Sequence, residues 1–281
     1  MDHSVLVVTL PENMSLLRLD FDKLEKTVKK LPCNIHVNFL EKFVLQAKNT
    51  PTTYYGKQME KGLPPMIEFP VDYFSKNQEL RVLIFLHELI HACQHVIVFQ
   101  RFHRHTMAKR REYKALAEFQ VTMEITQKKD IAIQYFEYTL YLIDLYYKII
   151  FEAWNHLYMK ENYPELFEKE LTNVHEILSN GTKNGLFDNW DAQYMLEIHS
   201  KLLESTFFAK ICNGYSIQSS FEELAKFWDN KLNSICKSNE FEKLTSVKDK
   251  MTTIDSYPNS ETLELQYLMF CQLIWDRTLF D

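Results

Sequence analysis

Glycine is scarce in this chain, with only 5 among 281 residues, where average usage of about 7% predicts about 20. Glycine supplies the positive-φ positions of hairpins, bulges and phosphate-binding loops. So little glycine argues against a β-sandwich, a Rossmann fold or a P-loop enzyme. Hydrophobic residues make up 46% of the chain and include 20 Phe, 15 Tyr and 4 Trp, enough to fill a sizeable core. This composition favours a mostly helical globular protein.

The cysteines and the charges exclude further classes of protein. Five cysteines, odd in number and without a CxxC pair, argue against a disulfide framework and a structural zinc knuckle. The net charge of −6 gives no basic footprint for nucleic acid. The N-terminus lacks a signal-peptide pattern, and the most apolar stretch, residues 131–158, contains four charged residues. We therefore expect a cytoplasmic protein without membrane insertion.

Hydrophobic periodicity distinguishes a mixed front part from a helical remainder. Residues 4–10 and 34–40 are typical of strands, residues 13–31 of a helix, and Met66–Phe69, flanked by prolines, of a short edge strand. Ser75 and Gln78 match a capping box, which predicts a helix to about residue 103. Further helices are expected at 110–127, 130–160, 164–180, 188–211, 219–236 and 261–279. The predicted fold class is α+β, predominantly α-helical, with a small N-terminal sheet.

The helix that follows Ser75 contains the pattern His87-Glu88-Leu89-Ile90-His91. Two histidines four residues apart project from one helical face, so both can reach a single zinc ion at about 2.0–2.1 Å. Glu88 lies one step round the helix, too far to the side to bind the ion easily. It is well placed to accept a proton from a metal-bound water. The pattern therefore predicts a Zn²⁺ cofactor with Glu88 as the general base.

A zinc ion held by two histidines needs a third protein ligand. The candidates are three glutamates on the next predicted helix: Glu112, Glu118 and Glu124. At 100° per residue, Glu112 falls on an apolar stripe, where a carboxylate without a cation is costly. That stripe consists of Ala115, Leu116, Phe119 and Met123. Glu112 is thus the predicted third ligand and Glu118 the alternative.

The HExxH segment, with Glu112-Tyr113-Lys114-Ala115 after it, resembles the core of gluzincin-like, minimal-zincin HExxH zinc metallopeptidases. A glutamate followed three residues later by alanine is frequent as the second motif of such families. The resemblance covers about residues 65–127 and implies that the two histidines and Glu112 bind zinc, with Glu88 as general base. Leu116 replaces the aspartate that usually follows the alanine, so the residue that orients a ligand histidine is unassigned.

This resemblance predicts a zincin-like metallopeptidase domain at residues 1–127, with residues 128–281 as a helical region packed on it or continuous with it. The predicted activity is zinc-dependent hydrolysis of peptide bonds in a peptide or protein substrate. Two alternatives remain: a non-catalytic regulatory or interaction protein that retains a zincin-like domain, and a bacterial effector protease secreted without a conventional signal. The candidates for oxyanion or substrate contacts are Tyr113, His103, His105 and His156.

Overall fold

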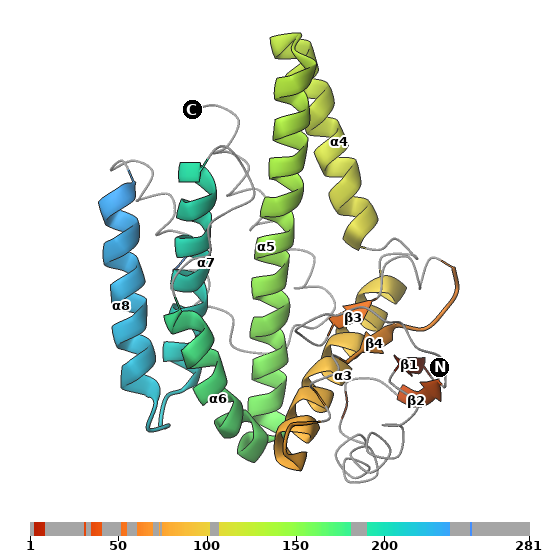
Figure 1. Ribbon diagram of the computed structural model, residues 1–281, viewed down its shortest axis with the longest axis vertical. Coiled ribbons are helices and arrows are strands. Elements are labelled where there is room, and N and C mark those ends of the chain that lie inside the picture. The colour runs from red at the N-terminus through yellow and green to blue at the C-terminus, as the bar shows by residue number, and fades with distance from the viewer. Residues whose placement is uncertain are drawn as a thin grey trace. The chain divides into compact units, whose positions relative to one another are not determined.

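The computed structural model describes residues 3–8, 31, 35–40, 52–54, 61–69, 73, 75–101, 107–180, 190–236 and 248. The chain divides into two compact units, residues 1–117 and residues 118–281. Most described residues are helical (Figure 1), which confirms the prediction of a predominantly α-helical protein. Within these ranges, no helix combines the length and the apolar character that a membrane span needs. The helices predicted at 13–31 and 261–279 lie outside the described residues.

The first unit contains a four-stranded sheet with the strand order β2-β1-β4-β3. Its strands are β1 (His3–Val8), β2 (Ile35–Leu40), β3 (Thr52–Tyr54) and β4 (Met66–Glu68). β1 runs parallel to both of its neighbours, with Val5 opposite Val37 on β2 and Leu6 opposite Met66 on β4. β3 runs antiparallel to β4. β1 therefore joins the two halves of the sheet.

The prediction that Met66–Phe69 forms an edge strand is wrong. β4 lies between β1 and β3 and pairs with both of them. The neighbouring prolines, Pro64, Pro65 and Pro70, fall outside the strand itself, so they remove no backbone donor from its ladder. Prolines that flank a strand limit its length but do not confine it to the edge of a sheet.

Helix α3 (Gln78–Arg101) carries the HExxH pattern and begins two residues later than a Ser75 cap implies. The amide of Leu80 donates a hydrogen bond of 2.9 Å to Oδ1 of Asn77. Asn77 thus satisfies one of the free amides of the first turn, as an N-cap residue does. The helix was predicted correctly, but the assignment of Ser75 as its cap is wrong, because a second capping residue lies closer to the helix.

One face of α3 packs on the sheet. Its residues in this core, all buried, are Phe85, Leu89, Ala92 and Cys93, which cluster with Val5 of β1 and Ile67 of β4. At 100° per residue, these four helix positions fall within an arc of about 100°. The sheet therefore fixes the rotation of α3 about its axis, and the positions of His87 and His91 fall on the opposite side of the helix.

The described part of the second unit consists mainly of helices, and the boundary between the units falls within α4 (Met107–Thr126). The later helices are α5 (Lys129–Asn162), α6 (Pro164–Ser179), α7 (Trp190–Ile211) and α8 (Gln218–Ile235). All five agree with the predicted ranges to within three residues at each end. Ile198 and Leu202 of α7 pack with Trp228 and Leu232 of α8 in a buried cluster, which joins the last two helices.

Two lysines satisfy carbonyl groups at helix ends in the second unit. Lys160 Nζ donates to the carbonyl oxygen of Ile211, the last residue of α7, at 2.6 Å. Lys201 Nζ donates to three carbonyl oxygens at the end of α6, those of Ile177, Leu178 and Asn180. Trp228 Nε1 also donates to Leu178, at 3.1 Å. Because the last carbonyls of a helix lack intrahelical partners and carry partial negative charge, an ammonium group is well suited to this position.

Candidate metal-binding site

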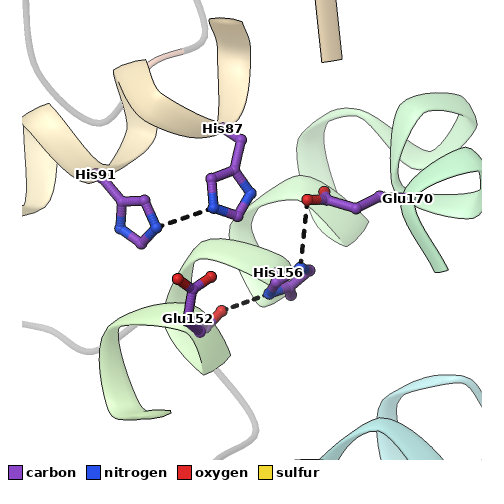
Figure 2. Close-up of polar contacts among 5 residues, drawn as sticks. All are labelled: His87, His91, Glu152, His156 and Glu170. Atoms are coloured by element: carbon purple, nitrogen blue, oxygen red, sulfur yellow. Dashed lines mark hydrogen bonds and ion pairs between the residues drawn. The ribbon is translucent and has the colours of Figure 1, made fainter. Parts of the chain in front are cut away.

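His87 and His91 lie one turn apart on α3 and face each other (Figure 2). Their Nε2 atoms are 3.0 Å apart, and the two partly buried rings are inclined at 72°. Two nitrogen ligands at 2.0–2.1 Å from a tetrahedral ion lie about 3.3 Å from each other. The observed separation is close to that value, so the pair can supply two nitrogen ligands to one metal ion.

Gln94 fixes the orientation of the His91 ring. Its Oε1 lies 2.8 Å from Nδ1 of His91, and the Gln94 side chain is only 1% exposed. The sequence-based reasoning missed this residue, although its spacing of three from His91 is one at which helical side chains meet. His91 therefore has one ring nitrogen on a buried amide and the other directed at His87.

Glu88 and His95 accompany the histidine pair on α3, and both are buried. Burial holds the pKa of His95 well below its usual value of 6.5, and the charge of nearby His91 lowers that pKa further. His95 is therefore neutral at physiological pH and adds no positive charge beside the pair. Glu88 is 9% exposed, so its carboxylate is largely shielded from bulk water on the same helix as both candidate ligands.

The predicted third ligands lie on α4, where the backbone is described but the side chains of Glu112 and Glu118 are not. Glu112 was favoured because it shares a predicted buried face with Leu116. That prediction is wrong for Leu116, which is 48% exposed. Burial instead follows Ala115 and Thr122, seven residues apart. On a helical wheel, Glu112 and Glu118 fall about 60° to either side of that line. The rotation of α4 about its axis therefore does not distinguish Glu112 from Glu118 as the third ligand.

Among the candidates for oxyanion contacts, only His156 has a described side chain. The others, which lie outside the described residues or side chains, are His103, His105 and Tyr113. His156 lies on α5 and is 3% exposed. Its Nδ1 donates to the carbonyl oxygen of Glu152 at 2.7 Å, and its Nε2 lies 3.6 Å from Oε1 of Glu170 on α6 (Figure 2). His156 thus belongs to a buried polar cluster within the second unit.

Glu204 on α7 is an acid of that unit with a perturbed pKa. Its desolvation by burial raises the pKa from 4.5 to about 7, and the charge of Glu152 raises it as well, against the opposing charges of Lys148, His156 and Lys201. These neighbours come from α5 and from α7 itself. The sequence-based reasoning missed Glu204, because no local pattern distinguishes it from the other glutamates of the helices.

Comparison with known proteins adds no relative, since the chain matches no protein-family model, no curated protein and no solved structure. Of the predicted site residues, the structure brings His87 and His91 together and buries Glu88 on the same helix. A functional assignment therefore depends on this local arrangement and on the sequence pattern that produces it.

Proposed function

We propose that this chain is a zinc-dependent metallopeptidase, with His87, His91 and Glu112 as zinc ligands and Glu118 as the alternative third ligand. The observation that carries the proposal is the 3.0 Å separation of the two Nε2 atoms. Both ligands come from one helix, whose other face is fixed by a buried core. A metal site on such a rigid helix is preorganised, because its two histidines need little motion to bind an ion.

The donor set suits zinc, since two neutral imidazoles and one carboxylate are a common protein ligand set for a catalytic zinc ion. A bound zinc ion would polarise a peptide carbonyl and bring the pKa of a coordinated water towards 7. Glu88 accepts the proton of the attacking water on a carboxylate oxygen and then donates it to the departing amine nitrogen. The carboxylate of the third ligand offsets one of the two positive charges of the ion.

The proposal is tested by metal analysis of the purified full-length chain, followed by cleavage of an unbiased peptide library. We expect one zinc ion per wild-type chain. The Glu88→Gln variant should retain its zinc, and its cleavage rate should be about 10²–10⁴-fold lower than that of the wild-type chain. His87→Ala and His91→Ala are expected to lose the zinc. A chain that binds no zinc contradicts the proposal.

A matched control is available in α6, where His175-Glu176 begins like the motif but lacks the second histidine. The His175→Ala variant should keep both zinc and activity. The Glu88→Gln variant also separates the peptidase from the non-catalytic alternative. If zinc binds but neither the wild-type chain nor this variant cleaves any peptide, the interaction protein that retains a zincin-like domain becomes the better explanation.

A further inference from the structure

Gln94 contacts His91, one member of the histidine pair, through an acceptor atom. Its Oε1 lies 2.8 Å from His91 Nδ1, and a carboxamide oxygen can only accept a hydrogen bond. The ring nitrogen opposite it must therefore carry the hydrogen, so Nδ1–H of His91 donates to Gln94. In a neutral imidazole, the other nitrogen, Nε2, then has its lone pair free of hydrogen.

The nitrogen left with a lone pair is the one a metal ion needs. His91 Nε2 is the atom that lies 3.0 Å from His87 Nε2. Two lone pairs facing each other at that distance would repel, so without a metal ion the hydrogen between these atoms belongs to His87 Nε2. His91 is thus held in its ligating tautomer by Gln94, whereas His87 must move a proton before it can bind an ion.

We infer that Gln94 is a positioning residue of the zinc site, which selects the Nδ1–H tautomer of His91 and fixes the direction of its ring. The inference rests on the proposed function, because it assigns Gln94 a part in that same site. Residues that orient a metal-bound histidine commonly contribute 10–100-fold to metal affinity. Gln94 is almost fully buried, so water is poorly placed to replace its oxygen atom.

The tautomer can be measured in the metal-free protein by ¹⁵N NMR of histidine-labelled full-length chain, with the His91 signal assigned from the His91→Ala variant. Nitrogen shifts distinguish Nδ1–H from Nε2–H imidazole. We expect His91 to be predominantly Nδ1–H in the wild-type chain and to lose that preference in Gln94→Leu. Predominant Nε2–H in the wild-type chain overturns the inference, whatever the folding of the variant.

Zinc affinity, measured by competition with a chromophoric chelator, provides the second readout. Gln94→Leu is expected to bind zinc 10–100-fold more weakly than the wild-type chain, whereas Gln94→Glu, which keeps an acceptor oxygen at the same place, should bind at least as tightly. Equal affinity of the wild-type chain and Gln94→Leu overturns the inference but leaves the peptidase proposal standing. Failure of the wild-type chain to bind zinc at all contradicts the peptidase proposal itself.

Discussion

Replacement of Glu204 by glutamine should change how the stability of this protein depends on pH. The pKa of Glu204 is raised from 4.5 to about 7, with desolvation by burial as the largest cause and the charge of Glu152 as the next. Between these two pH values the folded chain holds a proton that the unfolded chain has released. The free energy of unfolding must therefore fall as the pH rises through this window.

The size of the effect follows from the shift in pKa. One pKa unit corresponds to about 1.4 kcal/mol, so a rise from 4.5 to about 7 makes the wild-type chain about 3 kcal/mol less stable above pH 7 than below pH 4.5, through Glu204 alone. Glu204 as a whole residue is only partly buried, which makes the figure an upper value. Glutamine has nearly the same shape and no charge, so the Glu204→Gln variant should not show this loss.

The assay is urea unfolding at pH 5 and pH 8, followed by tryptophan fluorescence, to which Trp154 and Trp228, both buried in the second unit, contribute. Relative to the wild-type chain, Glu204→Gln should gain stability at pH 8 by about 2–3 kcal/mol more than at pH 5. Glu223→Gln, which alters an exposed carboxylate on α8, is the control. If the stability difference between Glu204→Gln and the wild-type chain is the same at both pH values, the assigned environment of Glu204 is refuted.

Three further predictions concern the candidate site and its support. Glu112→Gln should abolish tight zinc binding in metal analysis, whereas Glu118→Gln should keep the zinc and cost only a few tenths of a kcal/mol; the reverse result assigns the ligand to Glu118. Lys201→Met removes the donor to three carbonyls at the end of α6 and should lower the free energy of unfolding by about 2 kcal/mol, so an unchanged urea midpoint contradicts that role. Leu89→Ala opens a cavity in the fully buried core beneath α3 and should cost about 3 kcal/mol, whereas Leu116→Ala, at a half-exposed position, should cost less than about 1 kcal/mol.

The helices of the second unit could be predicted because their signal is local. An apolar side chain every three or four residues indicates both the helix and its buried face, and the predicted ranges agree closely with α5 to α8. The start of α3 was predicted wrongly, because Ser75 and Asn77 are both of residue types that cap helices and only Ser75 was chosen. Tyr73 Oη donates to the carbonyl oxygen of Arg81, a contact across the first turn that no capping pattern includes.

The order of the strands and part of the site could not be predicted from local sequence patterns. Which strand neighbours β4 depends on pairing with residues far along the chain, and flanking prolines suggested an edge. Helix geometry alone places His87 and His91 on one face, one turn apart. The raised pKa of Glu204, in contrast, depends on side chains from another helix, and the exposure of Leu116 depends on which side of α4 is covered. Such features depend on tertiary packing, which the spacing of residues along the sequence does not reveal.

The central position of β1 has a consequence for synthesis of the chain. Leu6 of β1 pairs with Met66 of β4, sixty positions later. At about 5–20 residues per second, a ribosome needs roughly 3–12 s to add that stretch. During this interval one edge of β1, which has the sequence HSVLVV, lacks the strand that pairs with it in the folded protein. Unpaired strands rich in β-branched residues are prone to aggregate. We therefore expect nascent chains to depend on chaperones until β4 has emerged, with the helix that carries His87 and His91 docking on the sheet only after that.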